Sequence, residues 1–125
     1  MLFDTDVIIW ALRGNAKAAQ QIDRQADLQV SAVSYMELLK GARDKADQKN
    51  IKSFLHDLSF TFLPVTQDIS HRAVMYMEAF ALSSGMELAD ALIAATAAEH
   101  AQELCTANNR HYRVISELTL SIFRP

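Results

Sequence analysis

The chain has 125 residues, half of them hydrophobic, with only three glycines and two prolines, a composition typical of a well-packed globule with short connections. We expect one domain over residues 1–125. The net charge of −3 excludes a polybasic protein that holds nucleic acid by bulk attraction, so any such contact would be local. The single cysteine, Cys105, allows no internal disulfide, and no segment resembles a signal peptide or a membrane span. The expected location is therefore the cytoplasm, without membrane contact.

Short apolar runs in the first half of the chain predict three buried strands, at residues 2–4, 28–31 and 60–65. The segments between them carry apolar residues at helical spacing, and each begins near a polar residue that can cap a helix. The helices expected are one over residues 7–12 capped by Asp6, one from Asn15 to about Gln25, one opened by Ser34 and one capped by Asp47.

The second half of the chain continues this alternation. A long helix begins at Asp68 or Ser70 and ends at Gly85, which can adopt the left-handed conformation of a C-cap. After it come an alanine-rich helix from Leu88 to about Ala101, a strand at residues 103–106, a polar loop at 108–113 and a strand at 118–123. Alternating strands and helices predict a three-layer α/β/α sandwich with a central, mainly parallel sheet of four to five strands.

Three acids occupy positions at which a carboxylate is costly or unexpected. Asp4 ends the apolar first strand, Glu37 lies in the helix after the second strand, and Asp90 lies in the first turn of the alanine-rich helix. A buried carboxylate needs a partner, and in parallel sheets ligands bind beyond the carboxyl ends of the strands. Because all three elements reach that edge, we expect the acids to form one divalent-metal site, where a Mg²⁺ ion would relieve their repulsion.

Two of these acids also have a purely structural explanation. Glu37 could complete a Ser-x-x-Glu capping box with Ser34, and Asp90 could favour a helix N-terminus through the macrodipole. Only Asp4 lacks such an alternative. No two of the four histidines have the spacing of a zinc pair, and Cys105, which we expect in the core, has no cysteine partner, so a soft-ligand metal site is not expected.

Four segments resemble, in order, the signature blocks of PIN-domain ribonucleases of the VapC toxin type. They are residues 2–9 around Asp4-Thr5-Asp6, residues 31–41 with Ser31, Ser34, Glu37 and Gly41, residues 90–97 beginning Asp90-Ala91-Leu92, and residues 104–112 with Thr106-Ala107-Asn108 and His111-Tyr112. The resemblance spans nearly the whole chain. It implies that Asp4, Glu37 and Asp90 are catalytic, metal-binding acids. It also places the hydroxyls of Thr5 and Thr106 near the metal.

The resemblance further implies an endoribonuclease that depends on Mg²⁺, with Mn²⁺ as an alternative ion, and cleaves structured RNA to leave 5′-phosphate and 3′-hydroxyl ends. Its expected partners are the RNA substrate, a cognate antitoxin protein and a second copy in a homodimer. The chain departs from the family at Asn108, where many members have a fourth acid. Asparagine offers a neutral oxygen there, and thus one fewer negative charge for a second metal.

Basic side chains near the mouth of the site would contact the phosphates of the RNA; those we favour are Arg13, Lys40, Arg43 and Arg110. Two other interpretations remain open. A haloacid-dehalogenase-like phosphatase would use Asp4 as its nucleophile, but no lysine after Lys52 is present to neutralise the phosphorylated acid, which also argues against a phospho-receiver domain. A non-catalytic interaction module would not need all three acids.

Overall fold

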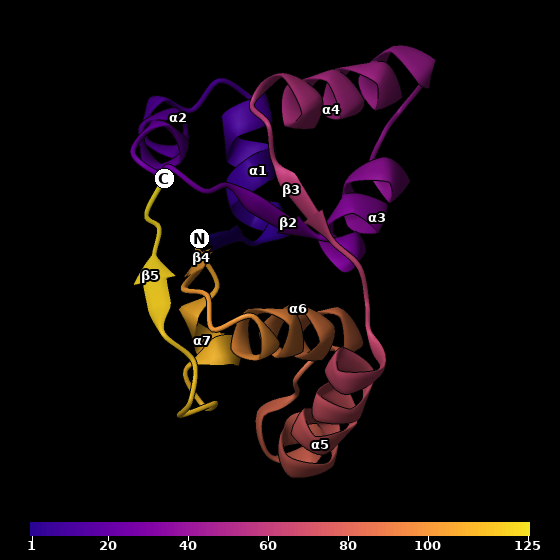
Figure 1. Ribbon diagram of the computed structural model, residues 1–125, viewed down its shortest axis with the longest axis vertical. Coiled ribbons are helices and arrows are strands. Elements are labelled where there is room, and N and C mark those ends of the chain that lie inside the picture. Colours follow the sequence, from indigo (N-terminus) through magenta and orange to yellow (C-terminus); the bar gives the residue numbers. More distant parts are fainter.

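Five short strands form the central sheet (Figure 1) of the computed structural model, which describes residues 1–125. In chain order they are β1 (Leu2–Phe3), β2 (Gln29–Ser31), β3 (Thr61–Leu63), β4 (Leu104–Thr106) and β5 (Leu120–Ile122). Their order across the sheet is β3-β2-β1-β4-β5, and every neighbouring pair is parallel. The predicted parallel sheet is therefore confirmed, with five strands.

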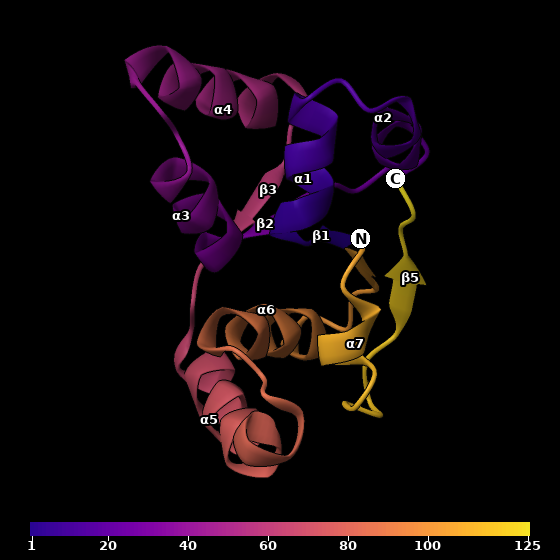
Figure 2. The same cartoon turned by 180° about the vertical axis from the view of Figure 1, so that it is seen from behind.

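Seven helices surround the sheet. They are α1 (Thr5–Leu12), α2 (Ala16–Asp23), α3 (Ala32–Lys40), α4 (Lys45–Asp57), α5 (Gln67–Ser84), α6 (Leu88–Glu99) and α7 (Asn109–Tyr112). Helices α1, α2 and α4 pack on one face and α5, α6 and α7 on the other, whereas α3 contributes to both cores (Figures 1 and 2). This is the predicted α/β/α sandwich. None of the helices has the combination of length and apolar sequence needed to cross a membrane.

Alternate residues of the central strands β1 and β4 enter the two hydrophobic cores, because successive side chains of a strand point to opposite faces. Leu2 and Leu104 pack with α5 and α6, whereas Phe3 and Cys105 pack with α1, α2 and α4. The central strands β1 and β4 are buried along their whole length, which explains why they are almost entirely apolar. Cys105 is completely buried, so its prediction as a core residue is confirmed.

The order of the strands creates a switch point between β1 and β4. From β1 the chain continues to β2 on one side, while β4 lies on the other side. Phe3 is in register with Cys105, and the Asp4 N–H donates to the Cys105 carbonyl at 2.9 Å. Asp4 and Thr106 therefore lie side by side at the carboxyl ends of adjacent strands. In open parallel sheets this is the crevice that binds ligands.

Four helices begin before the residue that the sequence predicted as their cap. The observed N-caps are Asp4, Ser31, Asp44 and Thr66, where the sequence predicted Asp6, Ser34, Asp47 and Asp68 or Ser70. Asp4 and Ser31 directly follow or end a strand, so those helices start as soon as the strand stops. Each observed cap accepts a hydrogen bond from a backbone N–H of the first turn, which satisfies a group that the helix itself leaves unpaired.

Other boundaries agree with the sequence. Asn15 caps α2, and Gly85 ends α5 with a φ of 65°, a left-handed conformation that favours glycine. The predicted polar loop at residues 108–113 is different, because it contains the single helical turn α7. This turn brings His111 and Tyr112 into contact with Asp90.

Candidate active site

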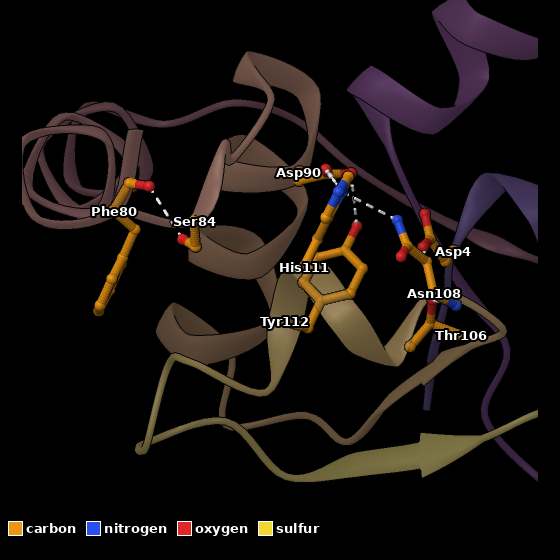
Figure 3. A network of polar contacts seen from close by, with 8 residues as sticks. All are labelled: Asp4, Phe80, Ser84, Asp90, Thr106, Asn108, His111 and Tyr112. Carbon is orange, nitrogen blue, oxygen red and sulfur yellow. Dashed lines mark hydrogen bonds and ion pairs between the residues drawn. The ribbon is translucent and has the colours of Figure 1, made fainter. Parts of the chain in front are cut away.

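Asp4 is held in place by two hydrogen bonds. Its Oδ1 accepts the N–H of Thr5 at 2.8 Å, which is the N-cap interaction of α1. Its Oδ2 accepts the Thr106 hydroxyl at 2.8 Å (Figure 3). The side chain is thus fixed jointly by the helix that it caps and by the end of the neighbouring strand.

Asp4 has no cationic partner. Only 6% of the residue is exposed, and burial, followed by the negative charge of Asp6, raises its pKa to about 7. The hydrogen bonds from Thr106 and Thr5 lower the pKa, and the charge of Asp90 raises it. No lysine or arginine forms an ion pair with Asp4, Asp6 or Asp90. Asp4 and Asp6 therefore have no basic partner, whereas Asp90 is paired with His111.

Asp6 does not cap α1, contrary to the prediction from the sequence. It lies in the first turn of α1, two residues after the cap residue Asp4. Its Oδ2 accepts the backbone N–H of Ala107 at 3.1 Å, which ties α1 to the segment after β4. Its Oδ1 is buried without a hydrogen-bond partner, and burial raises its pKa.

Asp90 makes its contacts to α7. Its Oδ2 lies 2.7 Å from Nδ1 of His111, and its Oδ1 accepts the Tyr112 hydroxyl at 3.2 Å (Figure 3). The Asp90 side chain is 15% exposed. Its position in the first turn of α6 agrees with the macrodipole explanation, but its oxygens are occupied by the side chains of α7.

Glu37 is connected to this cluster through Thr5. The Thr5 hydroxyl donates to Glu37 Oε1 at 2.6 Å, which joins α3 to α1. The predicted capping box is wrong, because Ser31 caps α3 and Ser34 lies inside the helix with its hydroxyl buried and unpaired. Glu37 is itself exposed, so its carboxylate stands at the solvent side of the buried acids.

His111 and Tyr112 are site residues that the sequence interpretation missed. Both belong to the segment quoted for the family resemblance, but neither was assigned a role there. Their spacing from Asn108 gives the only local signal: His111 lies three residues later, and its Nδ1 is 3.1 Å from Asn108 Nδ2. The Asn108 N–H donates to the Thr106 hydroxyl at 2.9 Å, so one polar chain runs from Asp4 to Asp90.

The predicted RNA-binding residues fall into two groups. Lys40 lies three residues after Glu37, close to one helical turn, and Arg110 adjoins His111 on α7. Arg13 lies beyond the C-terminal end of α1, about 12 Å of helix away from Asp4. With Arg43, which pairs with Asp47 at 2.9 Å, it lines a groove of about 520 Å³ between α1, α3 and α4. Lys40 and Arg110 are the two nearer the acids along the chain.

The donor atoms of the site fit a hard divalent cation. Carboxylate and hydroxyl oxygens are the ligands that Mg²⁺ and Mn²⁺ prefer. No three Asp, Glu, His or Cys side chains lie close enough together to hold an ion among them. Mg²⁺ usually binds through one or two carboxylates and completes its shell with waters and substrate phosphates. Asp4 and Asp90 match that mode of binding, because the Tyr112 hydroxyl donates to Asp90 and the negative charge of Asp4 also raises the pKa of that hydroxyl.

Comparisons with known proteins agree with this fold. Residues 1–116 match the family model described as PIN domain. The chain is 34% identical to Ribonuclease VapC10 of Mycobacterium tuberculosis over an aligned region of 122 residues, and this region covers 94% of the present chain and 90% of VapC10. The structure of the present chain is similar to a toxin-antitoxin complex from Klebsiella pneumoniae, with a TM-score of 0.79 and 28% identity over 94% of each chain.

A further solved structure shares the fold: VapBC2 from Rickettsia felis, bound to a DNA fragment from their promoter, has a TM-score of 0.82 and 17% identity over 98% of each chain. The family match encloses Asp4, Glu37, Asp90 and all of α7. It therefore includes the switch point between β1 and β4 together with the acids and hydroxyls described above. The chain belongs to the PIN-domain family, within the group of VapC-type ribonucleases.

Proposed function

We propose that this protein is a Mg²⁺-dependent endoribonuclease and the toxin of a toxin-antitoxin pair. The observation that carries the proposal is the pair of Asp4 and Asp90, which come from different elements, lie at the two ends of one chain of polar contacts, and form no ion pair with a lysine or arginine. A carboxylate with a raised pKa in a crevice is characteristic of a functional site. The names of the similar proteins, a ribonuclease and a toxin-antitoxin complex, support the same assignment.

The residues of the chain would prepare the reaction by fixing two carboxylates. Thr5 and Thr106 orient Asp4, while α7 orients Asp90. A Mg²⁺ or Mn²⁺ ion held by these acids would stabilise negative charge on the scissile phosphate and favour ionisation of the attacking water. The water oxygen bonds to phosphorus, the bond from phosphorus to O3′ breaks, and a proton passes to O3′. The products then carry a 5′-phosphate and a 3′-hydroxyl.

Glu37 and the nearby cations would complete the site. Glu37 is exposed and is held by Thr5, next to Asp4, a position from which it can orient the attacking water or hold a second cation. Lys40 and Arg110 are both exposed and would contact RNA phosphates, which positions the strand without reading its sequence. Arg13 and Arg43 would contact the RNA farther from the cleaved bond.

The test of the nuclease proposal is cleavage of RNA by the purified protein and by two carboxamide variants. We expect Asp4→Asn and Asp90→Asn to reduce cleavage to the background seen without protein, because each removes a charge that would hold the cation. Asp57→Asn is the matched control, since Asp57 is an exposed acid on α4 and should retain full activity. Melting curves verify that every variant is folded.

Sequencing of the cleaved ends identifies the chemistry and the target together. The 5′ ends should ligate without prior phosphorylation, and EDTA should stop their formation. Full activity of a folded Asp4→Asn protein would refute the mechanism. RNA left intact by the wild-type protein, across total cellular RNA and a range of divalent ions, would favour the non-catalytic interaction module. The haloacid-dehalogenase interpretation has lost its basis, because the family match is to the PIN domain.

The antitoxin proposal has an electrostatic rationale. An inhibitor that inserts a cationic side chain among the uncompensated acids would gain from the charges that serve catalysis. We expect the protein encoded beside this one to bind it and to stop RNA cleavage. Glu37→Gln should weaken that binding, whereas Asp57→Asn should not. A neighbouring protein that neither binds nor inhibits would contradict the toxin assignment and leave the nuclease proposal intact.

A further inference from the structure

The short helix α7 contacts both oxygens of Asp90, which lies at the start of α6 and is 21 residues away from His111 in sequence. His111 reaches Oδ2 at 2.7 Å and Tyr112 reaches Oδ1 at 3.2 Å. These residues are consecutive on one helical turn. Asp90 therefore has each of its oxygens held by a different ring, and its carboxylate plane is fixed (Figure 3).

The contacts of His111 determine which of its atoms carries the proton. Nδ1 lies close to Asp90 Oδ2 and to the Asn108 side chain. A bare Nδ1 would set its lone pair against that of the carboxylate, so Nδ1 must carry hydrogen and donate to Asp90. Asn108 then contacts His111 with its amide oxygen facing Nδ1, an exchange of O and N that leaves the shape of the side chain unchanged, and this oxygen shares the single Nδ1 hydrogen with Asp90.

Tyr112 is suited to donate permanently to this acid. The residue is completely buried. Burial and the negative charges of Asp4 and Asp90 raise the pKa of its hydroxyl far above the ordinary value, so the phenol keeps its proton. The ring also packs in the core with α5 and α6, which leaves the hydroxyl little freedom to turn away.

The segment that ends in α7 also holds Asp4. Its first residue, Thr106, donates to Asp4 and accepts the N–H of Asn108. One stretch of seven residues, 106–112, thus contacts Asp4 at its start and Asp90 at its end. This segment can therefore fix the distance between Asp4 and Asp90, which lie at the starts of the separate helices α1 and α6.

We propose that His111 and Tyr112 are positioning residues that clamp the Asp90 carboxylate from α7, and that Asn108 braces His111. This inference rests on the proposed function, because a clamped Asp90 matters when the carboxylate holds a cation for RNA cleavage. It also gives Asn108 a role that needs no negative charge, in contrast to a fourth metal-binding acid. Partners that orient a metal ligand typically contribute 10-fold to 100-fold to metal affinity or activity.

The experiment measures binding of Mn²⁺ and Mg²⁺ to the RNA-free protein by titration calorimetry. We expect His111→Ala to weaken Mn²⁺ binding about 10-fold. His111→Asn should restore most of it, because the asparagine amide nitrogen occupies the place of Nδ1. Tyr112→Phe keeps the buried ring, removes only the hydroxyl, and should weaken binding several-fold.

Cleavage assays provide a second readout. The Mg²⁺ concentration for half-maximal rate should rise in His111→Ala and Tyr112→Phe, while the KM for RNA stays unchanged, because neither residue is proposed to touch RNA. His71→Ala is the matched control, since His71 is an exposed histidine on α5. Melting curves in EDTA report any loss of folding.

Two results would overturn the clamp: wild-type Mn²⁺ affinity in both His111→Ala and Tyr112→Phe, or an equal loss in His111→Ala and His111→Asn. Failure of the clamp is distinguishable from failure of the proposed function. Wild-type protein that cuts RNA, with variants that bind Mn²⁺ normally, refutes the clamp alone. Wild-type protein that binds Mn²⁺ and cuts no RNA, with variants that bind weakly, refutes the nuclease and retains the clamp.

Discussion

Asp4 is a position at which stability and function oppose each other. An acid whose pKa is higher in the fold than in the unfolded chain binds more protons in the fold. The free energy of unfolding therefore decreases as pH rises between the two values, which for Asp4 are the ordinary 3.8 and about 7. Above that interval the folded protein carries a buried charge, and a bound cation would remove the penalty.

We predict that the Tm of the wild-type protein in EDTA falls between about pH 5 and pH 7.5, corresponding to about 2 kcal/mol of unfolding free energy. The Tm of Asp4→Asn should fall less over the same pH range, because the asparagine amide does not ionise. Some pH dependence should remain in this variant, since the pKa of Asp6 is also raised. Mg²⁺ should raise the Tm of the wild type more than that of the variant at the higher pH. Identical pH profiles for the two proteins would contradict this account.

The predictable part of the site is the part that strand ends define. Asp4 and Thr106 each end a strand that the sequence predicted, and the register of β1 and β4 brings the two residues together. The contact of Asp90 with His111 joins residues that are 21 apart in sequence. No local pattern encodes such a contact, since it depends on how α6 and α7 pack on the same face of the sheet.

At the scale of elements, the sequence predicted the type of nearly every segment but not where the helices begin. Each misplaced cap has a second capping residue within four positions: Asp4 or Asp6, Ser31 or Ser34, Asp44 or Asp47, and Thr66 or Asp68 or Ser70. These residues have similar intrinsic preference for the cap. The residue that becomes the N-cap is the one at which the extended backbone ends, and the pairing of the strands determines where that is.

Helix α3 offers a direct test, because its two candidate caps are both buried serines. Ser31→Ala should lower the free energy of unfolding by about 1 kcal/mol, since it removes the hydroxyl that accepts the Ser34 N–H. Ser34→Ala should leave stability unchanged or raise it, because the Ser34 hydroxyl is buried without a partner. Urea denaturation of both variants measures the difference.

The two substitutions remove the same atom from sites of equal burial, so each controls for the other in size and exposure. A larger loss in Ser34→Ala than in Ser31→Ala would restore the capping box predicted from the sequence. It would also reopen the structural explanation of Glu37, which would then accept a backbone N–H at the start of α3.

For the whole molecule, the side of the sheet that ends in β3 carries the clearest signal of association. Large apolar side chains are exposed there on three elements: Met36 on α3 is 57% exposed, Phe62 on β3 51%, and Met75 on α5 64%. The chain that leaves β3 passes beside α3 and leads down to α5 (Figures 1 and 2). β3 is moreover an edge strand, with backbone groups available for another chain.

We therefore predict a homodimer that forms through the β3 side, because exposed apolar side chains gain free energy when a second copy covers them. Light scattering across a wide concentration range should show the dimer mass, decreasing towards the monomer on dilution. Met75→Glu should raise the dissociation constant, since the carboxylate would lose water on association. Leu58→Glu introduces the same charge at an exposed position at the end of α4 and should leave the dissociation constant of the dimer unchanged. A wild-type protein that stays monomeric at every concentration, or equal effects of the two variants, would contradict association through the β3 side.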